Sequence, residues 1–287
     1  MKFASFMDGS QRHIGVVQPD GQSIRALDPS ISDMNVLIER FETLHGEMPL
    51  DGPVVALDKV RLCAPITPRR NIFCVGKNYR AHAKEFAGSG FEAGAVKGAE
   101  IDEFPAVFTK PATTVVAHGE AVELHGHITS SVDYEAELAL VIGKAGRDIT
   151  PENALQHIWG YTIVNDVTAR DRQRNHKQWF LGKALDTFCP MGPWITTADE
   201  VKGDDLDLKC WVNGELRQQA NTSDLLFDIP TLIATISAGL TLLPGDVIAT
   251  GTPAGVGIGF NPPRFLKPGD EVSIEIAGLG VLTNRFK

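Results

Sequence analysis

Paired cysteines are missing from this sequence. Its four cysteines, Cys63, Cys74, Cys189 and Cys210, form no C-x-x-C motif and lie far apart. A chain of 287 residues is long enough to bury a sizeable core without disulfide bonds. We therefore expect free thiols in a reducing compartment, which excludes a small secreted protein held together by disulfides.

Long hydrophobic runs are missing as well. The most apolar stretch, 232–243, is interrupted by Thr, Ser and Gly and is too short to span a bilayer. The opening residues, MKFASFMDGSQRH, contain no apolar region of a signal peptide. These absences predict a cytoplasmic protein with no membrane partner.

Positive charge is scarce. The sequence has 27 Lys and Arg against 36 Asp and Glu, which gives a net charge of −9 and a pI of about 5.4. No overall positive field attracts nucleic acid, so an anionic substrate must be bound by a local basic cluster. The composition, 43% apolar and 22% charged, is close to that of globular domains and excludes a disordered or collagen-like chain.

The first 66 residues carry the pattern of a small α+β domain. Three short apolar runs, KFASF, HIGVVQ and SIRAL, alternate with Asp-Gly and Pro-Asp-Gly turns, which predicts an antiparallel meander. A helix is expected after Ser32 or Asp33, because apolar residues then recur every three or four positions. A proline-rich stretch follows, and we place the boundary between domains at 1–66 and 67–287.

The larger segment is rich in strand signals and has few helices, so the expected class is mainly β (α+β). Asn213-Gly214 between two apolar runs predicts a hairpin with a type I′ turn. A helix is expected after Asp228 and should end near Gly239. The glycine-rich loop 88–98 is expected to serve as a lid.

The run SVDYEAELALVIG predicts a strand that is buried on both faces, because each face carries apolar residues. Alternation places Asp133, Glu135 and Glu137 on one face, with neighbouring Cβ atoms about 6.6 Å apart. Adjacent buried carboxylates repel unless a cation or a proton joins them, so Glu135 and Glu137 indicate a metal site. Oxygen ligands suit Mg²⁺, Mn²⁺ or Ca²⁺ better than Zn²⁺. An edge strand with both glutamates in solvent is the alternative.

A third carboxylate is expected from YTIVNDVTARD, which reads as a strand that ends at Asn165-Asp166. Asp166 would emerge at the strand end and is our third metal ligand. Asp171 competes for this role, although an acid among bases on the next turn ordinarily pairs with them, here with Arg170 or Arg172.

The run KNYRAHAKEF predicts a helix that places His82 and Glu85 on one face. A carboxylate beside an imidazole orients it and raises its basicity, so the pair can activate a water molecule. No second His follows at the spacing of a zincin motif. A surface ion pair on a helix would carry the same H-x-x-E pattern.

Several further polar residues are candidates for substrate contacts. Lys110 and Lys183 stand in apolar or tight surroundings, where either could hold a carboxylate or stabilise an oxyanion, although a surface lysine would give the same pattern. Gln173 follows Asp166 closely in the sequence. The run ATGTPAGVGIG lacks the helix that nucleotide-binding motifs require, so we interpret it as a tight loop whose Thr252 hydroxyl and N–H groups could approach a ligand. A plain Gly-Pro turn is the alternative.

Taken in order, these motifs resemble the fumarylacetoacetate hydrolase superfamily over roughly residues 70–287. The motifs are GKNYRAHAKE, FTKP, DYEAELALVIG, GYTIVNDVTARD, GKALDTFCPMGPWI, WVNGELRQ, TLLPGDVIATGTPAGVG and FLKPGDEVSIEIAGLG. The opening 66 residues look like the small N-terminal domain of many bacterial members. The resemblance implies a mixed β-sandwich roll that forms a homodimer.

The resemblance also implies roles for individual residues. Mg²⁺ or Mn²⁺, for which Ca²⁺ can substitute in crystals, is expected on Glu135, Glu137 and Asp166. The expected catalytic residues are His82, Glu85 and Lys183. The expected substrate contacts are Lys110, Gln173 and Thr252.

The implied reaction is the hydrolytic cleavage of a C–C bond in a 2,4-diketo acid, such as an acylpyruvate, fumarylpyruvate or a dioxo-deoxy-sugar acid. Water activated by His82 and Glu85 would attack the distal carbonyl. A decarboxylase of oxaloacetate or another 2-oxo acid, or a dienedioate isomerase, would use the same residues. A non-catalytic protein that binds metal and 2-oxo acids is the hypothesis from another class, and the complete His-Glu pair counts against it.

Overall fold

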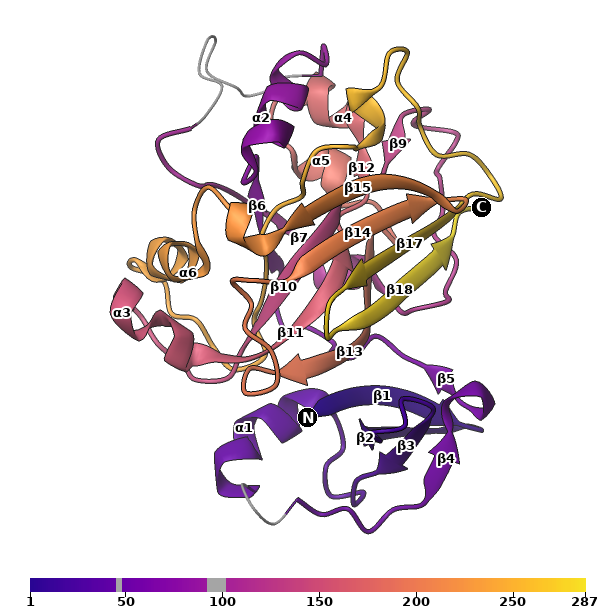
Figure 1. Ribbon diagram of the computed structural model, residues 1–287, viewed down its shortest axis with the longest axis vertical. Helices are drawn as coiled ribbons and strands as arrows, with labels where there is room; N and C mark the ends of the chain where they lie inside the picture. The colour runs from indigo at the N-terminus through magenta and orange to yellow at the C-terminus, as the bar shows by residue number, and fades with distance from the viewer. Residues whose placement is uncertain (45–47, 92–101) are drawn as a thin grey trace.

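The computed structural model describes residues 1–44, 48–91 and 102–287 (Figure 1). Its first part is a small α+β unit, drawn in indigo and purple. The elements of this unit are β1 (Lys2–Asp8), β2 (Gln11–Val17), β3 (Ser23–Ala26), α1 (Met34–Leu44), β4 (Val54–Ala56) and β5 (Arg61–Leu62). Asp33 caps α1 by accepting the N–H groups of Asn35 and Val36 at 2.7 and 3.1 Å. The three opening strands and the capped helix predicted from the sequence are confirmed.

Strand pairing joins this unit to the rest of the chain. β1 pairs antiparallel with β13 (Cys189–Thr197), with Lys2 opposite Thr196. Hydrophobic contacts also cross the junction, since the Phe3 ring stacks on Trp159 at 5.5 Å between centroids. The division of the chain at residues 66 and 67 therefore stays a proposal about domain organisation.

One large sheet runs through the molecule in the order β4-β3-β2-β1-β13-β11-β10-β16-β6-β7. Its remaining central strands are β6 (Ile72–Gly76), β7 (Ala106–Lys110), β10 (Ala136–Ile142), β11 (Ile158–Asn165) and β16 (Val247–Ala249). Neighbours along this order are antiparallel except β16 and β6, which are parallel. The short β8 (Val115–Val116) pairs with β13, and β9 (Val132–Asp133) pairs with β12 (Thr168–Ala169).

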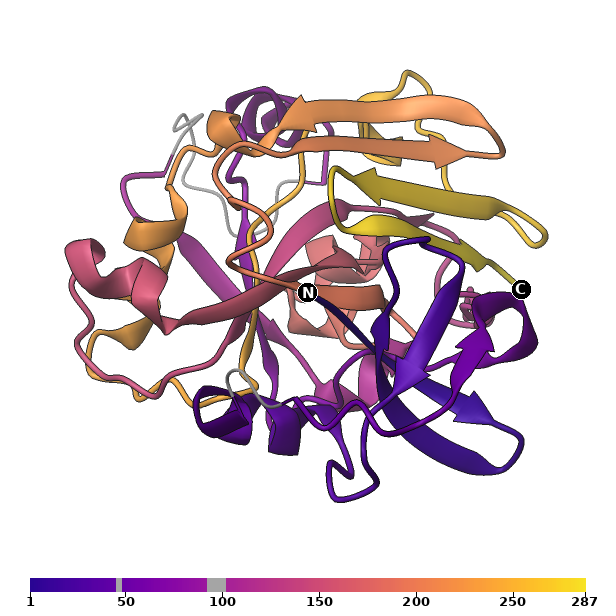
Figure 2. The ribbon, with the colours of Figure 1, turned by 60° about the horizontal axis from the view of Figure 1, so that its bottom comes forward.

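A second, four-stranded sheet packs against the large one (Figures 1 and 2). Its order is β15-β14-β17-β18, with bounds Glu215–Asn221, Asp207–Val212, Glu271–Ile276 and Gly280–Arg285. Leu138 and Ile163 of the large sheet and Leu208 and Ile274 of the small sheet belong to one buried apolar cluster. Burial of this cluster supplies the main favourable free energy of folding. The mainly β sandwich expected from the sequence is confirmed.

The helices are short and lie around the sheets. They are α2 (Arg80–Ala87), α3 (Pro151–Ala154), α4 (Arg170–Asn175), α5 (Phe180–Lys183) and α6 (Ile229–Ser237). Asp228 caps α6 as predicted, and the Asn213-Gly214 turn joins β14 to β15 with positive φ at both residues. None of the described helices has the length and apolar character that crossing a membrane requires. The expected lid at 88–98 lies mostly outside the described residues, which stop at 91 and resume at 102.

The predicted continuous strand over SVDYEAELALVIG is wrong in one respect. The structure has two strands, β9 and β10, interrupted at Tyr134 and Glu135. Side chains replace the ladder there, because Asp133 accepts the N–H of Tyr134 at 2.9 Å and the Asn165 side chain accepts the N–H of Glu135 at 3.0 Å. The predicted burial on both faces is confirmed along all of β10.

Candidate active site

Three buried carboxylates form the centre of the site. Glu135, Glu137 and Asp166 each offer an oxygen, and these oxygens lie within 4.8 Å of one another. Ala136, the first residue of β10, lies opposite Asn165, the last residue of β11, so Glu137 and Asp166 each follow a residue of this pair. Glu135 joins them from the gap between β9 and β10. The structure thus brings together the three residues that the sequence analysis selected as metal ligands.

Two lysines bind Asp166 from different directions. The Nζ of Lys183, at the end of α5, lies 2.7 Å from Oδ2 of Asp166 and 2.7 Å from Oε2 of Glu135. The Nζ of Lys110, at the end of β7, lies 2.6 Å from Oδ1 of Asp166 and 3.0 Å from the carbonyl oxygen of Val167. Both ammonium groups are buried, so their charges are balanced by these carboxylates.

Arg170 connects the cluster to a fourth acid. Its Nε donates to Oδ2 of Asp133 at 2.9 Å, and its Nη1 lies 2.7 Å from Oε1 of Glu135. The same Nη1 donates to Oε1 of Gln173 at 3.2 Å. Its Nη2 is buried and has no hydrogen-bond partner in the part of the chain that the structure describes. The guanidinium therefore fixes the position of Glu135 relative to α4.

The buried charges leave one acid without a basic partner. The buried ionisable set around the cluster consists of Asp133, Glu135, Glu137, Asp166, Lys110, Arg170 and Lys183. Among the described residues Glu137 forms no ion pair, and its Oε2 accepts the N–H of Gly251 at 2.9 Å. Burial, with the negative charges of Asp166 and Glu135, raises the pKa of Glu137 well above its usual value. A divalent cation held by these oxygens would relieve this repulsion, so the residues present fit an ion such as Mg²⁺ or Mn²⁺.

For Glu135 and Lys183, unlike Glu137, the attraction of neighbouring opposite charges outweighs the effect of burial on the pKa. Burial opposes the charge on Glu135, but Lys183 and Arg170 outweigh burial and lower the pKa of Glu135 to about 2. Burial also opposes the charge on Lys183, but Asp166 and Glu135 outweigh it and raise the pKa of Lys183. Both members of this ion pair are therefore charged at neutral pH.

His82 and Glu85 form a hydrogen-bonded pair on the inward face of α2. Nδ1 of His82 lies 3.0 Å from Oε2 of Glu85, and Oε1 of Glu85 accepts the N–H of Gly255 at 3.0 Å. A carboxylate at Nδ1 favours the tautomer that keeps the proton there and leaves Nε2 able to accept one. His82 is buried, which argues against the surface ion pair that the H-x-x-E pattern left open.

The glycine-rich run binds carboxylates of the protein itself. The N–H groups of three glycines donate to three acids of the site at 2.9, 3.0 and 2.6 Å: Gly251 to Glu137, Gly255 to Glu85 and Gly257 to Asp133. These N–H groups were expected to approach a ligand, and the structure shows them holding the side chains around the cavity. One loop therefore positions a candidate metal ligand, the His-Glu pair and the acid behind Arg170.

The site opens onto a small cavity of about 270 Å³, counting the part open to solvent. Its charged and polar wall consists of Lys77, His82, Glu135, Arg170, Gln173, Lys183 and Thr252. Its aromatic wall consists of Phe86, Phe108 and Trp179. The hydroxyl of Thr252 accepts a hydrogen bond from Nε2 of Gln218 at 2.7 Å, which leaves its own hydrogen available for donation.

Five of the predicted candidates do not line this cavity: Glu85, Lys110, Glu137, Asp166 and Asp171. Glu85, Glu137 and Asp166 lie behind the lining residues that they contact or adjoin, and the other two have different surroundings. Lys110 is fully buried against Asp166 and does not line the cavity. Asp171, the competitor for the third ligand position, lies outside the acid cluster, where its Oδ1 accepts hydrogen bonds from the Thr129 hydroxyl at 2.6 Å and the Arg172 N–H at 2.8 Å. Its neighbour Arg170 points to the cluster acids and not to Asp171.

Sequence reasoning missed three contributors. Asp133 was placed on the carboxylate face but was given no role, although the alternation pattern contained that signal. Lys77 and Trp179 were not selected at all. Lys77 has a φ of +55°, a backbone conformation uncommon for a residue with a side chain, and no spacing rule identifies it in advance.

Comparison with known proteins identifies the family. Residues 71–287 match the family described as fumarylacetoacetate (FAA) hydrolase C-terminal, and residues 1–65 match the family described as Rv2993c-like, N-terminal. The β-sandwich with its buried acids and His-Glu pair is thus the fold of a known enzyme family. This chain belongs to the fumarylacetoacetate hydrolase family, and the resemblance drawn from its motifs is confirmed.

Individual relatives differ in their named activities. Oxaloacetate tautomerase YisK from Bacillus subtilis is 51% identical over 233 residues, which cover 80% of this chain and 74% of that protein. The structure of a fumarylacetoacetate hydrolase from Exiguobacterium antarcticum is 44% identical, with a TM-score of 0.86 over 100% of this chain and 99% of that chain. The structure of maleylpyruvate hydrolase from Sphingobium sp. SYK-6 with manganese(II) and pyruvate is 34% identical, with a TM-score of 0.78 over 100% and 98% of the two chains.

Proposed function

We propose that this protein is a divalent-cation-dependent tautomerase that interconverts the keto and enol forms of oxaloacetate. The observation that carries the proposal is the His82–Glu85 pair, whose imidazole lines the same cavity as Glu135 of the acid cluster. A base beside a binding site for a 2-oxo acid is what proton transfer at the adjacent carbon requires. The similarity to oxaloacetate tautomerase YisK supports this choice among the reactions that such a pair can perform.

The His82 imidazole would move the proton. Its Nε2 takes a proton from carbon 3 of the substrate, and the electrons of that C–H bond form the double bond between carbons 2 and 3. The π electrons of the carbonyl group move to the oxygen on carbon 2, which takes a proton back from the imidazolium and becomes the enol hydroxyl. Glu85 holds the ring and stabilises the imidazolium that forms. The reaction adds or removes no atom overall, so it needs no co-substrate.

Glu135, Glu137 and Asp166 would hold the cation, for which we propose Mg²⁺. When bound, the ion supplies a Lewis acid that polarises the 2-oxo group. The Mn²⁺ in the maleylpyruvate hydrolase structure supports a divalent ion in this family. We propose that Lys183, which also pairs with Glu135, stabilises the negative charge that develops on the substrate oxygen. We propose that Lys110, which does not line the cavity, orients Asp166 and does not contact the substrate.

Lys77 favours a dicarboxylic substrate. Arg170 and Lys183, the other cations of the wall, both bind Glu135, whereas Lys77 pairs with Asp102, with 2.5 Å between Nζ and Oδ2. The Lys77 side chain is only 9% exposed, so little water screens the attraction between its ammonium group and a carboxylate. We assign the distal carboxylate of the substrate to Lys77, and further contacts with substrate oxygens to Gln173 and Thr252.

A second candidate is the hydrolysis of a diketo acid that the motif resemblance implied. In that reaction His82 takes a proton from water, whose oxygen bonds to the distal carbonyl carbon. The C–C bond then breaks, and its electron pair stays with the departing pyruvate unit, which is protonated at carbon 3. The similarity to maleylpyruvate hydrolase favours this candidate, and the enclosed His-Glu pair serves it equally well.

One assay separates these reactions. The enol absorbance of oxaloacetate, acetylpyruvate and fumarylpyruvate is followed in the ultraviolet with MgCl₂ or EDTA, while pyruvate release is measured in parallel. A tautomerase speeds the keto–enol equilibration of oxaloacetate in MgCl₂ without releasing pyruvate. Pyruvate from an acylpyruvate would indicate the hydrolase, and pyruvate from oxaloacetate the decarboxylase. No turnover of any substrate would contradict the enzyme proposals and favour a non-catalytic binding protein.

A further inference from the structure

Gln218 of β15 does not line the active-site cavity but binds one of its lining residues. Its side chain is fully buried, and its Nε2 donates to the hydroxyl oxygen of Thr252 at 2.7 Å and to the carbonyl oxygen of Pro253 at 2.7 Å. Its Oε1 accepts the N–H of Ala136 at 3.1 Å. One amide thus joins the small sheet to the start of β10 and to the loop that follows β16.

These three partners fix the orientation of the Gln218 amide. The N–H of Ala136 can only donate, so it requires the amide oxygen on its side. The carbonyl oxygen of Pro253 can only accept, so it requires the amide nitrogen. The two hydrogens of Nε2 are then used by Pro253 and Thr252. Turning the amide over would place a donor against a donor and an acceptor against an acceptor, which buried groups do not tolerate without cost.

The orientation of the amide decides the direction of the Thr252 hydroxyl. A hydroxyl group has one hydrogen to donate. Because the hydroxyl oxygen of Thr252 accepts from Gln218, this hydrogen points to a different partner, and no described residue accepts it. Thr252 is 2% exposed and lines the cavity together with Glu135 and Gln173. An oxygen of the substrate is the acceptor that fits there.

We propose that Gln218 is a positioning residue of the active site, which holds the Thr252 hydroxyl as a donor towards a substrate oxygen. Gln218 itself does not contact the substrate. If a group that only accepts stood in its place, the Thr252 hydroxyl would donate to that group and present its lone pairs to the substrate. The substrate oxygen would then face another oxygen, and binding would weaken. The inference deepens the proposed function and rests on its assignment of Thr252 to a substrate oxygen.

Gln218 also has a structural role, which must be separated from this one. Ala136, whose N–H binds Gln218, stands between Glu135 and Glu137 in the sequence. Loss of that hydrogen bond would disturb the acid cluster and weaken cation binding. Loss of the hydrogen bond to Thr252 would weaken substrate binding and leave cation binding intact. Measurement of both affinities therefore distinguishes the two roles.

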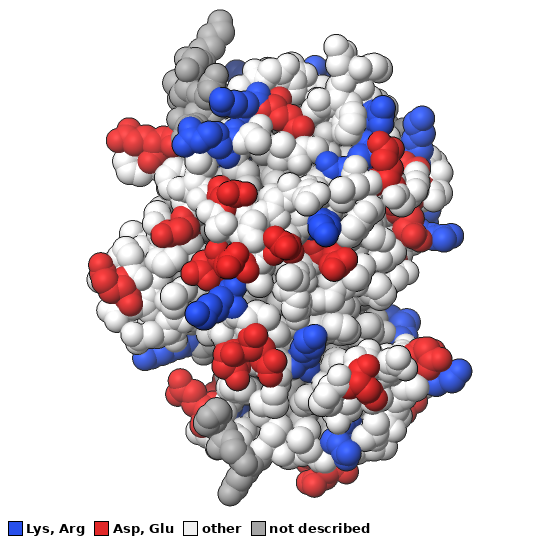
Figure 3. Space-filling view, viewed as in Figure 1, with Lys and Arg blue, Asp and Glu red and all other residues white. Residues whose placement is uncertain are grey.

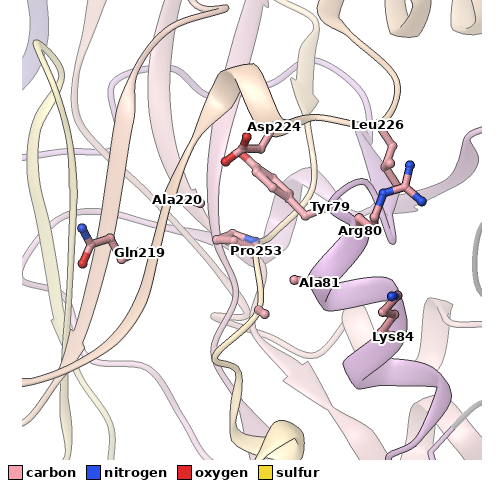
Figure 4. A pocket seen from close by; sticks show the side chains of 10 residues that line it. Tyr79, Arg80, Ala81, Lys84, Gln219, Ala220, Asp224, Leu226 and Pro253 are labelled. Carbon is pink, nitrogen blue, oxygen red and sulfur yellow. The ribbon is translucent and has the colours of Figure 1, made fainter.

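The next residue of β15 offers a matched control. Successive residues of a strand point to opposite faces, so Gln219 is exposed where Gln218 is buried. Figure 4, a view of the neighbouring pocket, shows the Gln219 amide directed away from Pro253. β15 lies on the face of the molecule that is turned to the viewer in Figure 1, and Figure 3 shows side chains of both charges scattered over that face. A carboxylate added at Gln219 therefore joins a surface of mixed charge.

The test is calorimetric titration of the full chain with pyruvate at pH 8 in saturating MnCl₂. Pyruvate is a 2-oxo acid, and its binding needs no turnover. Gln218→Glu keeps the acceptor for Ala136 and removes both donated hydrogen bonds. It should weaken pyruvate binding about tenfold or more, the usual effect of losing a hydrogen bond to a charged group, and should not weaken Mn²⁺ binding. Gln219→Glu, which adds the same charge at the next position, should leave both affinities unchanged.

A double-substitution cycle shows whether Gln218 acts through Thr252. Thr252→Val keeps the shape of the side chain without the hydroxyl and should weaken pyruvate binding about tenfold. In the Thr252→Val background, Gln218→Glu should cost less than about threefold more, because no hydroxyl is left to orient. A further loss of about tenfold would overturn the proposal, since repulsion by the new charge would then explain the effect. Gln218→Met, a second variant that adds no charge, should show the same dependence on Thr252.

Other outcomes also overturn the proposal. Unchanged pyruvate affinity in Gln218→Glu and Gln218→Met, with both variants folded by circular dichroism, would show that the Thr252 hydroxyl does not depend on Gln218. Parallel losses of pyruvate and Mn²⁺ affinity in Gln218→Glu would reduce Gln218 to a support of the acid cluster. The proposed function fails separately, when the unaltered protein does not equilibrate oxaloacetate, and the pyruvate titrations remain readable in that case.

Discussion

Gly255 donates its backbone N–H to Oε1 of Glu85 at 3.0 Å, and Oε2 of the same carboxylate lies 3.0 Å from Nδ1 of His82. The orientation of the imidazole thus depends on a loop residue 170 positions further along the chain. The same loop binds Glu137 through Gly251. A displacement of this loop would therefore disturb the proton-transfer pair and the acid cluster together.

Removal of the imidazole separates catalysis from cation binding. His82→Ala should lower the turnover of the 2-oxo acid by about 10²–10⁴-fold, which is the usual contribution of a positioned base. The cation affinity should stay the same, because His82 is not one of the clustered carboxylates. Turnover is measured by enol absorbance and cation binding by calorimetry with MnCl₂. Equal turnover in the variant would contradict the role of His82.

Gly255 should tolerate no side chain. Its φ is +105°, and a Cβ there would overlap the carbonyl oxygen of Arg217. Gly255→Ala should reduce the free energy of unfolding by more than about 2 kcal/mol, because backbone strain and overlap add. Gly119→Ala is the matched control, since Gly119 has a φ of +79° and open space around its Cβ position. Equal losses in urea unfolding of the two variants would show that the close approach to Arg217 is unimportant.

The stability of the cation-free protein should fall as pH rises above 4.5. The folded-state pKa of Glu137 is raised above the ordinary value of 4.5, so above that pH the folded state holds a proton that the unfolded state has lost. Glu135 has the opposite effect at lower pH, because its folded-state pKa of about 2 lies below the ordinary value of 4.5. Its contribution to stability is complete above pH 4.5 and is lost as pH falls towards 2. Thermal unfolding in EDTA between pH 5 and 8 measures the first effect.

Cations and Glu137→Gln test the cause of this pH dependence. MgCl₂ should raise the melting temperature more at pH 8 than at pH 6, because binding requires an ionised Glu137. Glu137→Gln should weaken the stabilisation by Mg²⁺ and flatten the decline of stability with pH in EDTA. An unchanged decline in this variant would assign the effect to another group.

Local patterns explain how much of this site could be predicted. Glu137 was found from the alternation along its strand and Asp166 from its place at the end of another, and the pairing of these two strands makes them neighbours. The break at Glu135 was not predictable from alternation, because it depends on the side chains of Asp133 and Asn165 replacing strand hydrogen bonds. Likewise, the partners of Lys110 and of the glycine loop lie 56 to 170 positions away, and no spacing within a motif reveals contacts of that range.

Lys110 should matter for folding as well as for the site. Its buried ammonium group lies 2.6 Å from Asp166, and Lys110→Met would leave that carboxylate with a single cationic partner, Lys183. Breaking a buried pair costs about 3–5 kcal/mol. Glu120→Gln, which removes the exposed pair with Arg61, should cost less than about 1 kcal/mol. Urea unfolding in EDTA measures both values, and similar losses would mean that Lys110 contributes no more than a surface lysine.

Lys77 should decide the preference for a second carboxylate. Its ammonium group pairs with Asp102 and, unlike those of Lys110 and Lys183, not with the acid cluster. Lys77→Met keeps a side chain of similar length without the charge. It should lower kcat/KM for oxaloacetate by about tenfold or more and leave kcat/KM for acetylpyruvate, which lacks the distal carboxylate, within about twofold. The proposed assignment assumes that the substrate takes over the ion pair with Asp102, so Asp102→Asn should raise the affinity for oxaloacetate. Equal losses on both substrates in Lys77→Met would instead show that Lys77 supports the structure of the cavity wall and does not recognise the distal carboxylate.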